Sequence, residues 1–150
     1  MGKNLKEKLR DEAKESLLKR NAEKTGVLRF LLSLLQNREI EKRGTGQSPM
    51  LGDEEVIEIL QREVKKRKEA IELFRKGGRP ELVEKETKEL VFINEYLPPQ
   101  MQREEIVSLV SGLKEKGLND FNSLMKEAAK ATKGLADGKL VSEIVREILK

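Results

Sequence analysis

The sequence has no cysteine, no histidine and no tryptophan, and aromatic residues make up only 3% of its 150 residues. The missing residue types exclude disulfides, cysteine nucleophiles, histidine general bases and metal sites built from thiolates or imidazoles. No apolar run reaches the roughly 18 residues that a membrane span needs, and the first residues carry no signal-peptide stretch. We therefore expect a cytoplasmic protein with no cofactor, no bound metal and no membrane partner.

Charged residues, in contrast, are abundant at 39%, beside 37% hydrophobic residues. This balance is typical of helices with large solvated surfaces and a core of leucine, isoleucine and valine. The formal net charge is only +4, and both signs are spread along the whole chain. If the protein binds nucleic acid, it must use a local stripe of positive charge rather than a strong overall field.

Two consecutive prolines, Pro98 and Pro99, interrupt a long helical pattern. Each lacks an N–H group and pushes the residue before it out of the helical region, so a helix must end near Leu97. We predict an all-α protein with two domains: a four-helix domain over residues 1–97 and a three-helix domain over residues 98–150. The prolines should act as a rigid elbow between them.

The first two helices are expected at Lys3–Arg20 and Val27–Ile40. The first has a narrow apolar stripe, with leucine or alanine at every fourth position. The second is apolar nearly all round, with Thr25 as a plausible cap. Such a helix is normally enclosed by others, so we interpret it as the core of the first domain.

A long αα-hairpin should complete the first domain, with helices at Asp53–Lys76 and Pro80–Leu97 joined by a Gly-Gly-Arg turn. Apolar residues recur at three-four spacing on both helices, with one polar residue on each: Arg67 and Glu86. Folding at the glycines brings these two together, so we predict an ion pair that fixes register rather than adding net stability. Tyr96, the only tyrosine, should anchor this end by touching other helices of the first domain or the second domain.

The run from Arg62 to Lys68 is strongly basic and tempting as a nucleic-acid patch. Consecutive residues of a helix point in different directions, and acidic residues are mixed in, so we interpret the run as a solvated helix face. The nucleic-acid reading stays open as the alternative.

After the prolines the apolar rhythm shortens to three helices of about three turns each. Gly117 closes the first, and Asn119 or Asp120 can cap the second. Gly134 ends the second helix, and Asp137, followed by Gly138, can cap the third. A domain of this size is only marginally stable on its own.

Four segments together resemble the GatB/YqeY family of small bacterial proteins, and they occur in order along the chain: Arg62–Ala70, Gly78–Leu82, Glu95–Gln100 and Ala136–Val141. The resemblance implies an all-helical, two-domain protein. It also implies kinship with the C-terminal tail of the B subunit of the tRNA-dependent amidotransferase, a helical appendage that engages tRNA. The most tail-like segment is Lys130–Gly134, with Leu140 and Val141 downstream.

Two positions depart from the family pattern. The family shows an arginine between the glycine and alanine of its Gly-Arg-Ala-Asp-Gly-Lys motif, and this chain has Leu135 there. If that arginine contacts a phosphate in relatives, the contact is lost here. Gln102 stands where the family tends to place a serine cap, and glutamine is the poorer cap.

Four lysines are candidate RNA-binding residues. Lys126, Lys130 and Lys133 are spaced four and three apart on one expected helix, so they should share a face. Lys139 follows near the start of the last helix, where free N–H groups attract anions. The surface suits phosphates rather than bases, because no aromatic or amide cluster accompanies it. A purely structural reading, in which Gly134–Lys139 is a tight interhelical turn, is compatible with it.

The favoured function is therefore a non-catalytic, tRNA-associated helical protein. One alternative is an adaptor that binds other proteins through the hairpin. Another is an accessory factor of the amidotransferase that acts on Glu-tRNA(Gln) and Asp-tRNA(Asn), with its subunits as partners. We do not expect independent catalysis, because the Gly-Gly-Arg turn lacks the Gly-Lys-Ser/Thr ending of a nucleotide-binding loop and no amidase signature is present.

Overall fold

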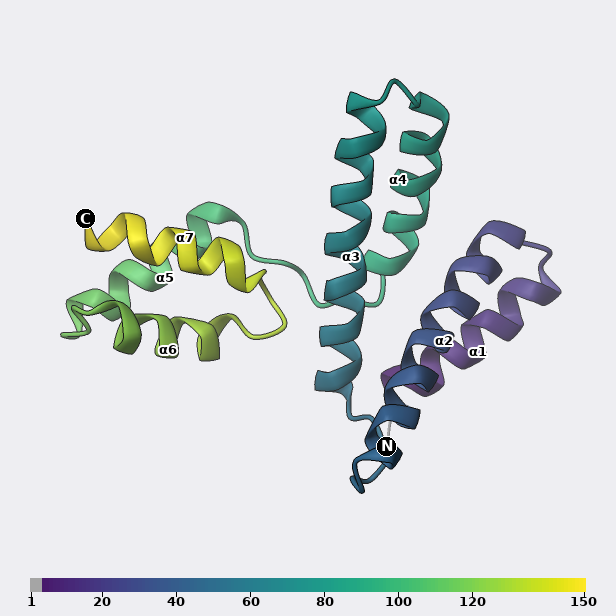
Figure 1. Cartoon of the computed structure of the whole chain (residues 1–150), viewed down its shortest axis with the longest axis horizontal. Coiled ribbons are helices and arrows are strands. Elements are labelled where there is room, and N and C mark those ends of the chain that lie inside the picture. The colour runs from purple at the N-terminus through teal and green to yellow at the C-terminus, as the bar shows by residue number, and fades with distance from the viewer. Residues whose placement is uncertain (1–3) are drawn as a thin grey trace. The chain divides into compact units, whose positions relative to one another are not determined.

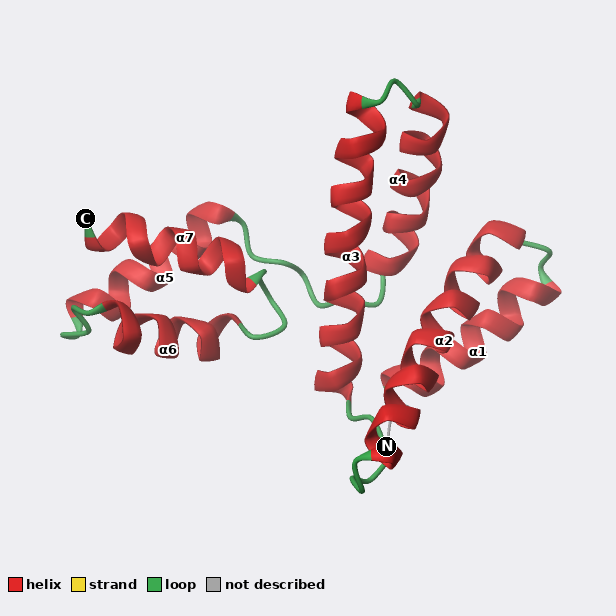
Figure 2. Ribbon diagram, viewed as in Figure 1, coloured by secondary structure: helices red, strands yellow, loops and turns green. Residues whose placement is uncertain are grey.

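Figure 1 shows the computed structural model, which describes residues 4–150. The described residues form only helices and loops (Figure 2), so the predicted all-α class is confirmed. The helices are α1 (Leu5–Leu18), α2 (Ala22–Gly44), α3 (Asp53–Lys76), α4 (Pro80–Asn94), α5 (Arg103–Glu115), α6 (Phe121–Thr132) and α7 (Gly138–Leu149). The chain divides into two compact units: unit 1 ends at Leu97, and unit 2 spans Pro98–Lys150.

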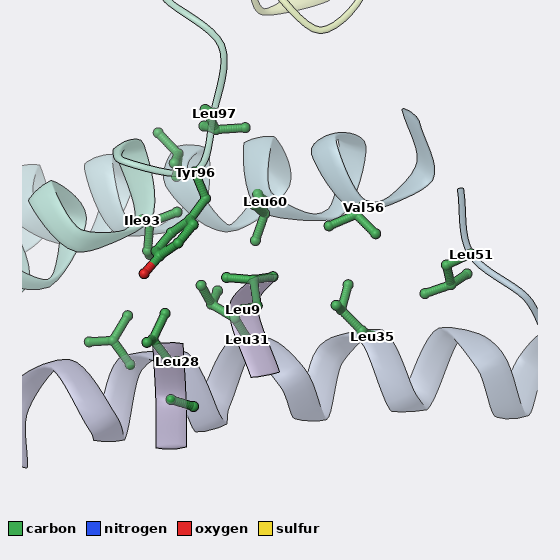
Figure 3. Close-up of a cluster of buried hydrophobic side chains, with 13 residues drawn as sticks. Leu9, Leu28, Leu31, Leu35, Leu51, Val56, Leu60, Ile93, Tyr96 and Leu97 are labelled. Atoms are coloured by element: carbon green, nitrogen blue, oxygen red, sulfur yellow. The ribbon is translucent and has the colours of Figure 1, made fainter. Parts of the chain in front are cut away.

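In unit 1, α1 packs along α2, and α3 packs along α4 (Figure 1). Helix α2 also contacts α3 and α4, so it touches the other three helices of the unit. Its leucines at positions 28, 31 and 35 are fully buried in one apolar cluster with residues of α3 and α4 (Figure 3). Removing this apolar surface from water is the main force that holds the four helices together.

Helix α2 begins earlier than the sequence predicted, and Thr25 is not its cap. Asn21 caps the helix by accepting a hydrogen bond from the Lys24 N–H at 3.2 Å. Thr25 lies inside the first turn, where its hydroxyl bonds the Asn21 carbonyl oxygen at 2.8 Å and lies 2.7 Å from the Ser16 hydroxyl. Asparagine outranks threonine as a cap, and the threonine is used instead to join α1 to α2.

The prediction that this helix forms the core of the first domain is confirmed, but α2 is not enclosed on all sides. Phe30 is 43% exposed and Ile40 is 55% exposed. The sequence shows how many apolar residues surround the helix axis, but only packing decides which of them are covered. The neighbouring helices cover the face of Leu28, Leu31 and Leu35.

The turn between α3 and α4 follows local chemistry. Helix α3 ends at Lys76, and Gly78 adopts a φ of +69°, a left-handed conformation that glycine accepts without strain. Pro80 occupies the first position of α4, where its missing N–H costs no helical hydrogen bond. Helix α4 ends at Asn94, three residues earlier than predicted, yet Leu97 remains buried in the cluster that contains Leu60 (Figure 3).

Unit 2 is a three-helix arrangement in which α5, α6 and α7 all contact one another. Its core is apolar and consists of residues that are less than 1% exposed: Ile106, Val110, Leu124, Ala128, Val141, Ile144 and Val145. As expected, Gln102 precedes α5 without making a side-chain cap. Gly117 follows α5 with a φ of +104°, and Asp120 rather than Asn119 caps α6.

Candidate phosphate-binding surface

Helix α6 carries the candidate surface because its buried positions fall on one side. Leu124, Ala128 and Thr132 recur at every fourth residue and face the core of unit 2. Lys126 and Lys130 are both exposed, and they are one helical turn apart, about 6 Å along the axis. The helix therefore presents two lysines on its solvent side.

The two lysines differ in their neighbours. Lys130 Nζ lies 3.5 Å from Glu127 Oε1, an exposed pair of the kind that contributes little and is screened by salt. Lys126 makes no ion pair with the part of the chain that the structure describes. Both amines therefore remain available to an anion in solution.

Lys133 is the last residue before the chain leaves α6, three residues after Lys130. It is the C-cap residue of α6, and its ψ of 124° takes the chain out of the helix. Gly134 then adopts a φ of +78°, and the Thr132 carbonyl oxygen accepts hydrogen bonds from the N–H groups of Leu135 at 2.8 Å and Ala136 at 3.1 Å. Lys133 is exposed at this end of the helix.

Lys139 lies in the first turn of α7. The N–H groups at the start of this helix are not all free, because the predicted Asp137 cap is present. Asp137 caps α7, and its Oδ1 accepts a hydrogen bond from the Lys139 N–H at 3.2 Å. A carboxylate thus occupies one of the N–H groups that would attract a phosphate. The Lys139 side chain is exposed and can still contribute charge.

The turn between α6 and α7 is tied to the segment that precedes α5. The Met101 N–H donates to the Leu135 carbonyl oxygen at 2.8 Å, and Gln100 Nε2 donates to the Gly134 carbonyl oxygen at 3.1 Å. Leu135, at the position of the family arginine, thus helps to hold the turn through its backbone carbonyl group. Sequence reasoning missed Gln100 and Met101, because hydrogen bonds between segments over 30 residues apart leave no local signal. These bonds support the structural reading of the turn.

In unit 1 the structure contains the predicted Arg67–Glu86 contact, with Arg67 Nη1 3.3 Å from Glu86 Oε2. Arg67 Nε also lies 3.1 Å from Glu63 Oε1, and Nη1 bonds Glu89. The guanidinium carbon lies 5.5 Å from the centre of the Phe30 ring, a distance typical of cation–π contact. Arg67 therefore joins α2, α3 and α4, whereas the sequence indicated only one partner.

Tyr96 contacts another helix of unit 1, one of the two options that the sequence left open. Tyr96 is 5% exposed in the apolar cluster (Figure 3). Its hydroxyl donates to Glu12 Oε1 at 3.0 Å. Burial raises the pKa of the Tyr96 hydroxyl well above its usual range, and the hydrogen bond and the negative charge of Glu12 raise it further. The side chain thus fastens the end of α4 to α1.

None of the helices in the described part of the chain is both long and apolar enough to cross a membrane. The fold and the exposed lysines define a small, all-helical protein with a charged surface. The family model described as Yqey-like protein matches residues 6–149, so the chain belongs to that family.

Three curated relatives are similar to this chain. A Schizosaccharomyces pombe protein described as uncharacterized is 34% identical over 95 residues, which are 63% of this chain and 73% of the relative. Two proteins are named altered inheritance of mitochondria protein 41, mitochondrial. That of Eremothecium gossypii is 30% identical over 102 residues, 67% of this chain and 54% of the relative. That of Lachancea thermotolerans is 30% identical over 107 residues, which are 70% of this chain and 55% of the relative. The chain spans just over half the length of these two relatives.

Proposed function

We propose that this chain is a non-catalytic, tRNA-associated protein that binds RNA phosphates through the lysines of unit 2. The observation that carries the proposal is the pair Lys126 and Lys130, exposed one turn apart on α6. Lys133 and Lys139 extend the positive charge along the following turn. Lysine amines bind phosphates as point charges, and this surface offers no aromatic group on which a base could stack. The binding is therefore expected to be insensitive to RNA sequence.

The test uses the full chain, unfractionated tRNA and a variant with Lys126→Gln and Lys130→Gln. Each lost phosphate contact should lower the slope of log Kd against log salt concentration by about 0.7 to 0.9. The control is Lys116→Gln with Lys150→Gln, which removes two exposed charges elsewhere on unit 2. If the two variants lower the slope equally, the net charge of the protein explains the effect, and the proposed site is contradicted.

Asp137→Asn sharpens the test. Asparagine caps a helix about as well as aspartate, so α7 should remain folded while a negative charge beside Lys139 disappears. We expect tighter tRNA binding with an unchanged circular dichroism spectrum. Weaker or unchanged binding would show that the turn after α6 does not approach the phosphates.

A second candidate function is a protein-binding adaptor that uses unit 1. It is favoured by two large apolar side chains on the solvent side of the α3–α4 pair, Leu73 and Val91, which are 69% and 58% exposed. Crosslinking in cells with and without nuclease treatment separates the two functions. A protein partner retained after RNA digestion would favour the adaptor.

A further inference from the structure

The basic run on α3 is divided by the structure into inward and outward residues. Of the seven residues from Arg62 to Lys68, five are basic and one, Glu63, is acidic. Glu63 and Arg67 turn inward and pair with each other, at 3.1 Å between Glu63 Oε1 and Arg67 Nε. The other basic side chains stay exposed: Arg62, Lys65, Lys66 and Lys68.

This division changes the charge that the helix presents to solvent. The only carboxylate of the run is engaged by Arg67, so it does not neutralise the outward cations. Arg62, Lys65 and Lys66 make no ion pair with the described residues of the chain. They are related by steps of three and four residues, so they lie on one face within about one turn, roughly 6 Å of helix length. The nearest carboxylates on that face are Glu58, one turn before Arg62, and Glu69, one turn after Lys65.

The chemistry of this face indicates its ligand. Protein–protein interfaces have apolar or aromatic centres that are depleted in lysine, whereas the exposed side of α3 between Arg62 and Lys68 contains only cations. Arginine binds a phosphate through two parallel hydrogen bonds, and lysine adds a mobile point charge. A row of unpaired cations without aromatic residues fits a nucleic-acid backbone and offers no means to read bases.

We propose that Arg62, Lys65 and Lys66 form a second phosphate-contact strip for RNA, carried by unit 1 and separate from the lysines of α6. The class of ligand rests on the proposed function, but the site does not use any residue of unit 2. Because phosphate contacts position an RNA without specifying its sequence, the strip adds affinity and salt dependence. It does not add base specificity.

The chain offers a matched pair of variants for the test. Arg62→Gln with Lys66→Gln removes an arginine and a lysine four residues apart on α3. Arg10→Gln with Lys14→Gln removes the same pair, at the same spacing, from the exposed side of α1. Glutamine is a good helix former, so circular dichroism should be unchanged in both. Binding of unfractionated tRNA to the full chain is measured from 50 to 300 mM salt.

We expect the α3 variant to lower the salt slope by roughly 1.5, the value for two lost phosphate contacts. The α1 variant should change the slope by a small fraction of that amount. Adding Lys65→Gln to the α3 variant should lower the slope by a further 0.7 to 0.9 or so. Equal slopes for the α3 and α1 variants would overturn the inference.

The α6 variant tested above distinguishes this inference from the proposed function. A lower salt slope in the α3 variant but not in the α6 variant would support the strip and contradict the lysine surface of unit 2. Loss only in the α6 variant would overturn the strip alone. An unchanged tRNA slope in the α3 variant, together with loss of a crosslinked protein, would assign the strip to an acidic protein and overturn the inference.

Discussion

Unit 1 and unit 2 are both helical and both enclose an apolar cluster, but they use polar groups differently. Unit 1 joins its helices by polar contacts near the core. Arg67 bonds carboxylates of α3 and α4, the hydroxyls of Ser16 and Thr25 lie 2.7 Å apart between α1 and α2, and Tyr96 bonds Glu12. These contacts are partly or fully shielded from water, so their geometry matters for stability.

Unit 2 has fewer polar links between its helices, and the part-buried one joins Lys114 Nζ of α5 to the Ile148 carbonyl oxygen of α7 at 3.1 Å. Its one buried polar side chain among those described is Thr132, whose hydroxyl donates to the Ala128 carbonyl oxygen within α6 at 2.8 Å. Its ion pair between Arg103 and Glu147, at 2.6 Å, is exposed. Packing of apolar side chains therefore holds this unit together with only a few polar links between its segments.

The difference affects how uniquely the packing of the helices is specified. Long amphipathic helices of similar pattern can pack in several registers, and a buried polar contact selects one of them at little net gain in stability. Three short helices, two of them capped by aspartates, have fewer alternatives. Unit 2 therefore has its charged side chains on the surface.

The largest expected effect comes from truncating one buried side chain in each core. Leu31→Ala in unit 1 and Ile144→Ala in unit 2 should each lower the free energy of unfolding by about 2 to 5 kcal/mol. Unit 2 is small and marginal on size alone, so Ile144→Ala should unfold it.

Tyr96 is the only tyrosine and no tryptophan is present, so intrinsic fluorescence reports on unit 1 alone. Ile144→Ala should therefore lower the helical circular dichroism signal while leaving the Tyr96 fluorescence native. Simultaneous loss of both signals would contradict the picture of two separate cores.

A smaller effect, confined to unit 1, is expected for Arg67→Ala. It leaves the carboxylates of Glu63, Glu86 and Glu89 partly buried without their cation, and removing one partner of a buried pair typically costs about 3 to 5 kcal/mol. We expect the lower end of that range, because Glu86 and Glu89 retain 23% and 20% exposure. Urea unfolding followed by Tyr96 fluorescence measures the change.

The control for this variant is Arg75→Ala, which removes an exposed arginine that pairs with Glu72 on the same helix. Exposed pairs contribute little, so the unfolding midpoint should hardly move. A similar loss in both variants would show that the cluster around Arg67 is no more important than a surface pair.

The smallest effect is expected at Tyr96 and depends on pH. Tyr96→Phe removes the hydrogen bond to the Glu12 carboxylate, and a bond to a charged group contributes about 1.5 to 3 kcal/mol. In the intact protein the pKa of Tyr96 is raised in the folded state. The unfolded chain therefore loses this proton first, and stability falls as pH rises above about 10.

The stability difference between the intact protein and Tyr96→Phe should therefore be constant below pH 9 and shrink at higher pH. Urea unfolding followed by circular dichroism from pH 7 to 11 measures it, since the variant lacks the fluorophore. A difference that stays constant to pH 11 would contradict the buried hydroxyl.

Several local features followed from the sequence because their causes act within a few residues. The Gly-Gly turn, Pro80 at the start of α4 and the cap of α7 by Asp137 all appear as expected. The errors also have local causes. Asn21 competed with Thr25 for the start of α2, and α4 gave way to a turn after Asn94.

The sequence by itself determined the helical class and the approximate positions of the helices, since proline, glycine and capping residues act on their own neighbourhood. Only the tertiary structure decided the roles of like residues within one run. Arg67 and Lys66 are adjacent, yet Arg67 meets Glu86 and Glu89 from another helix, while Lys66 faces water. A helix turns by about 100° per residue, so a neighbour that lies about 20 residues away along the chain determines which cation is paired and which stays exposed.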